Sequence, residues 1–438
     1  MLLIYTRSIT NRLKYTCDLI LGQLLGIEYQ LELAQLETQS RTGLAGLAYG
    51  CEIVGIPSIY NEGLLFETGI RPQKTEAAEY KNVPVFFFRK DSATMPFDFF
   101  SASFYLVSRY EEYLPYTPDA HNRFPAESSI LYKNEWLMLP LVNIWAKVLL
   151  KMLLEHFPDL KHQERKFEYR STIDIDLAFK YRHKGLFRHL GGLAKDVLSF
   201  NKVKLNERRN LLTGKISDPF DNFEYQRAIH QKYETKVNYF VLLGDYALFD
   251  KNTPYKNLHF RQLIRQLDLT DTVGIHPSYA SNNKKGQAEQ EKMRLENILG
   301  REVRVSRLHF LMHHMPDTYH RLIAMGIKED HTLGYTTNSG FRAGIAAPFF
   351  WYDLQNEAVT DLLCVPFCHM DITPRHYKGW SIEKSKAELT LFMESVHRAN
   401  GLFVSLWHNE SLSDSEQWKG WKELYEYSCE EGRRLKNV

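Results

Sequence analysis

From residue 166 onward, short apolar runs typical of strands alternate with amphipathic stretches typical of helices. The apolar runs predict strands at Phe167–Ile173, Lys236–Leu243, Val273–His276, Glu302–Phe310, Leu362–Phe367 and Leu402–Trp407. Helices are predicted between them at Asn222–Tyr233, Asn257–Leu267, Gln287–Leu299, Asp317–Met325 and Ile382–Ala399, with Gly300 and Gly326 where two of them should end. This alternation favours parallel strand pairing, either in a barrel or in a doubly wound sheet.

The first 165 residues have a different character, being rich in aromatic residues and turns. They contain a strand-like run at Val83–Phe88 and a 3.6-residue apolar period over Leu139–Phe157. A chain of 438 residues is also longer than one ordinary hydrophobic core supports. We therefore expect a smaller α+β domain of unknown role over residues 1–165 and an α/β domain over residues 166–438, with Arg182–Pro219 as an insertion in the latter.

Charge and cysteine content narrow the class of protein. The 55 basic and 53 acidic side chains give a net charge of +2, which predicts neither a nucleic-acid surface nor a membrane-binding patch. Five scattered cysteines do not form a disulfide framework and suit a reducing compartment. We see no leader sequence and no apolar run of the length a membrane span needs, so a cytoplasmic location is expected. The oligomeric state is not predicted.

Two carboxylates mark the end of the first strand of the second domain. Asp174 and Asp176 close the run Ser171-Thr-Ile-Asp-Ile-Asp. Side chains alternate along a strand, so both should point the same way, about 6–7 Å apart along the backbone. Two like charges this close raise each other's pKa unless a cation lies between them. A metal held by one carboxylate while the other serves as a base would resolve that conflict.

Further polar side chains end other strands of the same domain. They are His276, then Arg307 and His309 two residues apart, and finally His408. The carboxyl ends of parallel strands open on one rim, where active sites form. One aspartate and two histidines with open positions are a common catalytic ligand set for a divalent ion such as Zn²⁺.

On these motifs, residues 166–425 resemble the NodB-homology polysaccharide deacetylases of carbohydrate esterase family four. The Thr-Phe-Asp-Asp motif of that family corresponds here to Thr172-Ile-Asp174-Ile-Asp176, and its Leu-x-His motif to Leu406-Trp407-His408. Its His-Ser/Thr-x-x-His motif corresponds to His276-Pro-Ser-Tyr279, without the second histidine. Its Arg-x-Pro-Tyr motif corresponds to Arg307-Leu308-His309. The whole chain, including Phe97–Phe124 and Gly334–Asp353, also resembles uncharacterised bacterial proteins labelled polysaccharide deacetylase-like.

The resemblance implies a distorted (β/α) barrel that hydrolyses an N-acetyl group of an amino sugar or polysaccharide precursor with the help of a metal. In this reading Asp174 is the base, Arg307 orients it, and His408 protonates the leaving amine. Asp176 and His276 bind the ion, and His309 replaces the missing histidine. The saccharide would contact Arg342, Trp407 and Tyr279, with Trp407 or Phe310 as an apolar wall.

Several alternatives stay open at this point. The domain could be a metal-free glycosidase-like barrel with paired carboxylates, or a saccharide-binding module that has lost catalysis. Cys364, Cys368 and His369 could hold a metal but fit buried core packing better. The histidines His309, His313 and His314 lack the glutamate of a zincin helix. Arg342 could bind an anionic sugar or pair with an acid such as Asp353.

Overall fold

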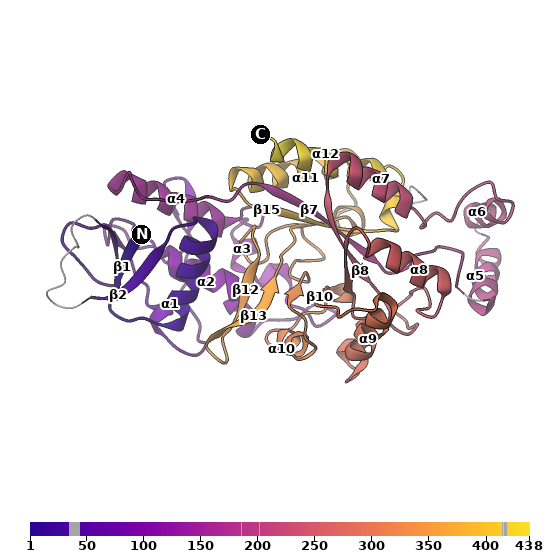
Figure 1. Ribbon diagram of the computed structural model, residues 1–438, viewed down its shortest axis with the longest axis horizontal. Coiled ribbons are helices and arrows are strands. Elements are labelled where there is room, and N and C mark those ends of the chain that lie inside the picture. Colours follow the sequence, from indigo (N-terminus) through magenta and orange to yellow (C-terminus); the bar gives the residue numbers. More distant parts are fainter. Residues whose placement is uncertain (35–43, 185, 201, 414, 416–417) are drawn as a thin grey trace.

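The computed structural model describes residues 1–34, 44–184, 186–200, 202–413, 415 and 418–438 (Figure 1). Positions 185 and 201 of the predicted insertion therefore lie outside the described residues. Within this part of the chain, no helix combines the length and the apolarity needed to cross a bilayer. All five cysteines are free, and all except Cys51 are buried, as expected for thiols packed in a core.

The N-terminal segment is built around a small parallel sheet with strand order β2-β1-β3-β4. Its strands are β1 (Leu2–Thr6), β2 (Tyr29–Leu33), β3 (Ala45–Tyr49) and β4 (Ser58–Ile59), and a hairpin of β5 (Ala78–Tyr80) and β6 (Val83–Val85) stands apart. The helices are α1 (Asn11–Cys17), which continues as a π-helix over Asp18–Leu24, α2 (Phe99–Val107), α3 (Ile130–Lys133) and α4 (Leu141–His156). The predicted strand at Val83–Phe88 is therefore only half as long as expected.

The second sheet contains nine strands in the order β12-β13-β11-β10-β9-β8-β7-β15-β14. Their bounds are β7 (Glu168–Ile175), β8 (Lys236–Val241), β9 (Thr272–Ile275), β10 (Val305–Ser306), β11 (Glu329–Asp330), β12 (Phe349–Asp353), β13 (Ala358–Cys364), β14 (His369–Met370) and β15 (Leu402–His408). Every neighbouring pair is parallel except β12 and β13. Among the described residues β12 and β14 pair on one side only, so the curled sheet is a barrel that does not close.

Helices cover the outside of this sheet (Figure 1). They are α7 (Phe223–Tyr233), α8 (Leu258–Leu267), α9 (Gln287–Leu299), α10 (Asp317–Ala324), α11 (Ile382–Arg398) and α12 (Trp421–Lys436). The predicted insertion contains the helices α5 (Leu186–Leu198) and α6 (Lys202–Leu212), which project from the end of the molecule farthest from the N-terminal sheet. The predicted helices and their glycine ends therefore agree with the structure to within one or two residues.

One hydrophobic core runs through both parts of the chain. A single cluster of buried side chains extends from Leu2 in β1 to Leu435 in α12. Tyr15 of α1 and Phe104 of α2 both pack their rings on Tyr352 of β12. The N-terminal segment thus covers the antiparallel end of the curled sheet.

Strand register brings the predicted polar positions to one rim. His408 of β15 lies directly opposite Asp174 of β7, and Ile175 of β7 lies opposite Val241 of β8. Val241 in turn pairs with Ile275 of β9, and Ile275 with Ser306 of β10. The residues that follow these positions leave their strands at the same level, which is the carboxyl end of the sheet.

The predicted strand Glu302–Phe310 is mostly not a strand. Only Val305 and Ser306 pair in the sheet, and a 3-10 turn follows at His309–Leu311. Phe310 in this turn has a φ of 58°, a left-handed conformation that a bulky residue rarely adopts. Arg307 and His309 were expected to share one face of a strand, but the turn sends His309 to a different neighbour.

Candidate metal centre and cavity

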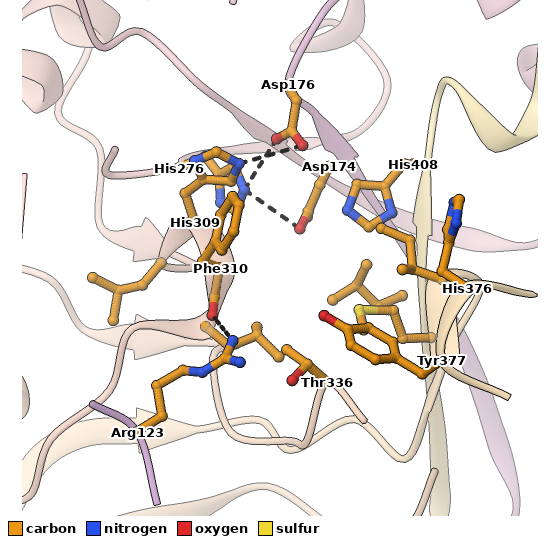
Figure 2. A pocket seen from close by; sticks show the side chains of 15 residues that line it. Arg123, Asp174, Asp176, His276, His309, Phe310, Thr336, His376, Tyr377 and His408 are labelled. Atoms are coloured by element: carbon orange, nitrogen blue, oxygen red, sulfur yellow. Dashed lines mark hydrogen bonds and ion pairs between the residues drawn. The ribbon is translucent and has the colours of Figure 1, made fainter. Parts of the chain in front are cut away.

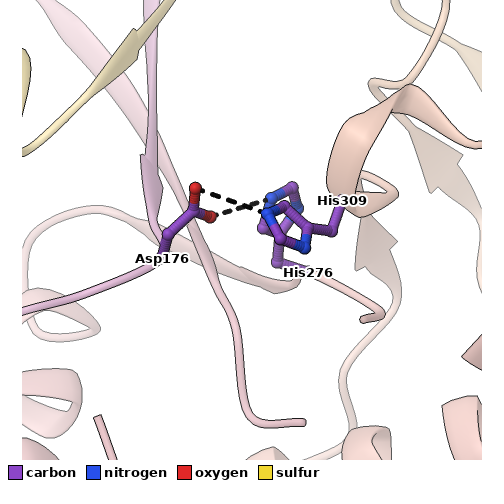
Figure 3. Close-up of side chains that lie close together, drawn as sticks. All are labelled: Asp176, His276 and His309. Atoms are coloured by element: carbon purple, nitrogen blue, oxygen red, sulfur yellow. Dashed lines mark ion pairs between the residues drawn. The ribbon is translucent and has the colours of Figure 1, made fainter. Parts of the chain in front are cut away.

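Three side chains from three strand ends gather at the rim (Figure 3). Asp176 follows β7, His276 follows β9, and His309 lies in the turn after β10. Their ligand atoms all lie within 4.8 Å of one another. The closest pairs join His276 Nε2 to Asp176 Oδ1 at 3.3 Å and His309 Nε2 to Asp176 Oδ2 at 3.5 Å. These are the three residues that the resemblance implied as ligands.

Each histidine is oriented by a hydrogen bond on its other nitrogen. His276 Nδ1 lies 2.6 Å from the carbonyl oxygen of Arg307, and His309 Nδ1 lies 2.9 Å from Asp250 Oδ1. Asp250 also accepts hydrogen bonds from the backbone amides of Tyr279 and Ala280. A carbonyl or carboxylate on Nδ1 holds the ring so that Nε2 is free to bind a metal. Asp250 lies in the loop after β8, where no sequence pattern pointed to it.

The unpaired atoms of this cluster fit a divalent cation. His276 Nε2 and Asp176 Oδ1 are buried and have no hydrogen-bond partner. Buried polar atoms are normally satisfied, so two that face one another need an explanation. Two imidazole nitrogens and a carboxylate suit Zn²⁺ and other divalent ions of the first transition row.

Without an ion, the electrostatics of the cluster keep Asp176 ionised and favour a protonated His309, which must release that proton to bind a metal. Burial raises the pKa of Asp176, but His309 and His276 outweigh burial and hold that pKa well below its usual range. Burial lowers the pKa of His309, yet Asp176 and Asp250 outweigh it and raise the pKa to about 9. Asp176 therefore stays ionised at neutral pH, as a ligand must.

Asp174 lies beside the cluster and is held by Arg307. The guanidinium Nη1 donates to Asp174 Oδ1 at 2.9 Å, while Nε donates to the carbonyl oxygen of His331 at 3.0 Å. Arg307 is fully buried and lies 4.5 Å from the ring centroid of Phe240. The other oxygen of Asp174 lies 3.6 Å from His276 Nε2. Asp174 is therefore fixed next to the candidate metal position by a charge-assisted hydrogen bond.

His408 approaches the same space from β15, and Asp371 holds it. The His408 backbone amide donates to Asp371 Oδ2 at 2.7 Å, and its ring Nδ1 lies 2.9 Å from Asp371 Oδ1. Burial lowers the pKa of His408, but Asp371 outweighs burial, with help from Asp176 and Asp174, and raises it to about 10. Asp371 was not predicted, although it follows the short strand β14 just as Asp174 ends β7.

These groups line one cavity of about 300 Å³ (Figure 2). Asp174, Asp176, His276, His309 and His408 form its polar side, and five aliphatic side chains form much of the rest: Leu308, Leu311, Met370, Ile372 and Leu406. Arg123, Phe310, Thr336, His376 and Tyr377 complete the lining. Among these, Arg123 comes from the N-terminal segment.

Three of the predicted saccharide contacts lie elsewhere. Trp407 is fully buried, donates from Nε1 to Ser405 Oγ at 2.9 Å and packs on Tyr425 of α12, because strand alternation turns it away from His408. Tyr279 lines a neighbouring cavity and bonds its hydroxyl to His121 Nδ1 at 3.2 Å. Phe310, named as the alternative wall, does line the site.

Arg342 is the third misplaced contact. Its Nε and Nη2 donate to Glu112 at 2.8 and 2.7 Å, and its Nη1 donates to the carbonyl oxygen of Gly334. The partner is Glu112 rather than the expected Asp353, which instead contacts His320. Because this buried guanidinium is paired on both edges, it is a link between two parts of the chain and not a sugar contact.

The other candidate metal groups do not assemble. Cys364 and Cys368 are buried free thiols, and His369 packs against Trp407. His313 points to Glu112, with Nδ1 at 3.7 Å from Oε2, and lies outside the cavity. Among the described residues, only the Asp176, His276 and His309 group has the arrangement of a metal site.

Comparison with known proteins found one matching family model and several solved structures of low identity. A family model described as a family of unknown function (DUF7033) matches residues 2–158, and no curated protein matches the chain. A candidate polysaccharide deacetylase from Mycobacterium smegmatis is similar in structure, with 13% identity and a TM-score of 0.38 over 60% of this chain and 84% of that one. PuuE allantoinase has 9% identity and a TM-score of 0.35 over 60% and 83% of the two chains.

A third similar structure is a CE4 family pseudoenzyme from Bacillus anthracis, with 12% identity and a TM-score of 0.27 over 60% of this chain and 62% of that one. At these identities a likeness concerns the fold alone. Both the fold class and the chemistry are therefore argued from this chain's own strands and residues.

Proposed function

We propose that this protein is a metal-dependent hydrolase that removes an N-acetyl group from an amino sugar. The observation that carries the proposal is the cluster of Asp176, His276 and His309, whose ligand atoms lie within 4.8 Å of one another, with Asp176 Oδ1 and His276 Nε2 buried and without hydrogen-bond partners. Asp174 and His408 lie in the same cavity on adjacent strands, so a base and an acid flank the candidate metal position.

The residues divide the chemistry of amide hydrolysis between them. A divalent ion bound by Asp176, His276 and His309 would polarise the acyl oxygen and make water a stronger nucleophile. Asp174 accepts the proton of the attacking water, and Arg307 orients that carboxylate through its hydrogen bond. His408, protonated at neutral pH by its contact with Asp371, donates a proton to the departing nitrogen.

The cavity lining suits an N-acyl sugar. Leu311, Met370 and Leu406 present apolar surface to an acyl group or a ring face, while Arg123 and Thr336 lie across the cavity from Asp174 and Asp176 (Figure 2) and offer polar atoms there. Pockets that bind small ligands combine a mainly apolar wall with a few such polar groups.

A metal-free glycosidase is less well supported. Asp174 and Asp176 both face the same atom, His276 Nε2, at 3.6 and 3.3 Å. Two glycosidase carboxylates must stand on either side of the bond that they cleave. Here the two aspartates lie on one side of the cavity, beside a histidine.

The direct test compares metal content with turnover in two variants. Purified protein should hold about one divalent ion per chain, release acetate from N-acetylated amino sugars, and lose activity to a chelator until Zn²⁺ is returned. Asp174→Asn removes the base but no ligand, so turnover should fall by about 10²–10⁴-fold while metal content stays normal. His276→Ala removes a ligand, so this variant should lose both the bound metal and the turnover.

The matched control is Asp361→Asn, an exposed carboxylate on β13 far from any cavity lining, which should change neither quantity. A protein that binds metal and saccharide but releases no acetate would be the non-catalytic binding module instead. A protein without bound metal that still hydrolyses its substrate would contradict the proposal, and so would an Asp174→Asn variant with near-normal turnover.

A further inference from the structure

The candidate site opens to solvent mainly on one side. Of the side chains that line the cavity, His376 and Tyr377 are exposed, and both belong to the short π-helix Thr373–Tyr377. Every other lining residue that the structure describes is buried or only partly buried. The exposed part of the described lining is therefore this helix, where His376 lies next to His408 (Figure 2), and we take it as the mouth of the cavity.

Arg123 forms the wall on a side away from that mouth. It is 6% exposed, and its guanidinium is held from two directions. Nε donates to Asp119 Oδ2 at 2.8 Å, and Nη1 donates to the carbonyl oxygen of Phe310. The loop that carries Arg123 is also tied to itself, because Asp119 Oδ1 accepts from the amides of His121 and Arg123. The wall is thus a fixed part of the N-terminal segment.

A second cavity, of about 80 Å³, lies behind this wall. It shares Arg123, Leu311 and Thr336 with the candidate site, so these three side chains separate the two spaces. The second cavity is also lined by Glu127, which is exposed to solvent. Arg123 therefore stands between the candidate site and a second way out to the surface.

The geometry points to a site that accepts one terminal N-acyl amino sugar, or the free monosaccharide, and rejects sugars inside a polymer. This inference rests on the proposed function and narrows its substrate. A sugar ring inside a polymer that entered this cavity would need an exit for the neighbour on each side, whereas among the described lining residues only His376 and Tyr377 are exposed. Its volume of about 300 Å³ also lies at the lower end of the ~300–1,000 Å³ range of ligand pockets.

The test uses the metal-loaded full chain with N-acetylglucosamine and its β-1,4-linked oligomers of increasing length. Mass spectrometry locates each residue that loses acetate, and calorimetry measures binding of the same oligomers. Deacetylation should occur at a chain end with at least about a tenfold preference over internal residues. Both binding and turnover should scale with the concentration of chains and not with that of sugar residues.

Two variants of the wall separate its volume from its charge. Arg123→Ala should join the two cavities and open a second exit, so that internal residues become substrates and the end preference falls by about tenfold. Arg123→Met keeps most of the side-chain bulk without the ion pair and should retain the end preference. Asn122→Gly, an exposed neighbour whose φ of 62° suits glycine, is the control for the loop.

Failure of this inference and failure of the proposed function look different. Deacetylation of internal residues by the unaltered protein, or binding that scales with sugar residues, would overturn the terminal-sugar inference and leave the proposed function intact. Metal-loaded protein that releases no acetate would refute the proposed function, and the binding data would still decide the inference. If neither the monosaccharide nor any oligomer binds, the terminal-sugar inference is overturned.

Discussion

At the scale of single residues, the site depends on side chains that orient other side chains. Asp250 turns His309, Arg307 holds Asp174, and Asp371 holds His408 by both its backbone amide and its ring. Such contacts set the direction and the protonation of a group without touching the substrate themselves. Asp371 is the clearest case, because its carboxylate is the main influence that raises the pKa of His408 to about 10.

That contact predicts a pH effect. An acid must be protonated to donate, so turnover should fall as pH rises through the pKa of His408. In Asp371→Asn the carboxylate is gone and burial still favours the neutral ring, so the alkaline limb of the kcat/KM profile should move to lower pH by about 1–3 units. Asp371→Glu retains the charge, so its alkaline limb should lie between that of Asp371→Asn and that of the unaltered protein. An alkaline limb that stays in place in Asp371→Asn would show that His408 is not the acid.

At the scale of elements, the strand that carries both aspartates is positioned by the helix behind it. α12 packs against β7 and β15, where the hydroxyl of Tyr169 lies 3.0 Å from Ser405 Oγ and 3.0 Å from Ser428 Oγ. Gly432 lets the helix approach closely, since a Cβ there would lie 2.3 Å from the ring of Tyr169. The close approach holds β7, the strand that carries Asp174, against the helix.

A pair of glycine substitutions tests this packing. Alanine is the better helix former by about 1 kcal/mol, but Gly432→Ala should still lower the free energy of unfolding by about 1–3 kcal/mol because the core is overpacked. In α5 a Cβ at Gly191 would meet nothing within 4 Å. Gly191→Ala should therefore raise the free energy of unfolding by about 0.5–1 kcal/mol. Urea unfolding of both variants measures the difference, and equal effects would contradict the close contact at Gly432.

At the scale of the whole molecule, a buried ionic network joins the N-terminal segment to the curled sheet. Glu112 accepts hydrogen bonds from Arg342 at 2.8 and 2.7 Å and from Arg109 at 2.8 Å. Burial raises the pKa of Glu112, but Arg342 and Arg109 outweigh it and hold the pKa well below its usual range. With the shared hydrophobic core, this network should make the two parts unfold together.

The network predicts a stability change that depends on pH. Glu112→Gln leaves the buried guanidinium of Arg342 without its charge partner and leaves Arg109 paired with Glu111 alone, and it should cost about 3–5 kcal/mol at neutral pH. Because the folded pKa of Glu112 is depressed, this contribution is present above the ordinary glutamate pKa and is lost as pH falls towards the folded value. Calorimetry should show one transition at lower temperature, while Glu302→Gln, in an exposed pair with Arg304, should leave it unchanged.

The sequence by itself determined the alternation of strands and helices, the parallel pairing of most strands, and most residues of the candidate site. Asp174, Asp176, His276 and His408 were predicted because local periodicity shows where a strand ends, and parallel strands end on one rim. Trp407 was predicted to contact the saccharide, although the same periodicity turns it away from its neighbour His408. These features are local, so they can be read from nearby residues.

Only the tertiary structure decided which distant residues meet. Arg123 lies against Phe310 across 187 positions of the chain, and Arg342 pairs with Glu112 across 230. Asp371 and Asp250 contact their histidines from a short strand end and a loop that carry no distinctive pattern. The separate N-terminal domain stays a prediction, since one core spans both parts. Such pairings depend on how whole elements pack, and packing is a property of the three-dimensional arrangement that no local period encodes.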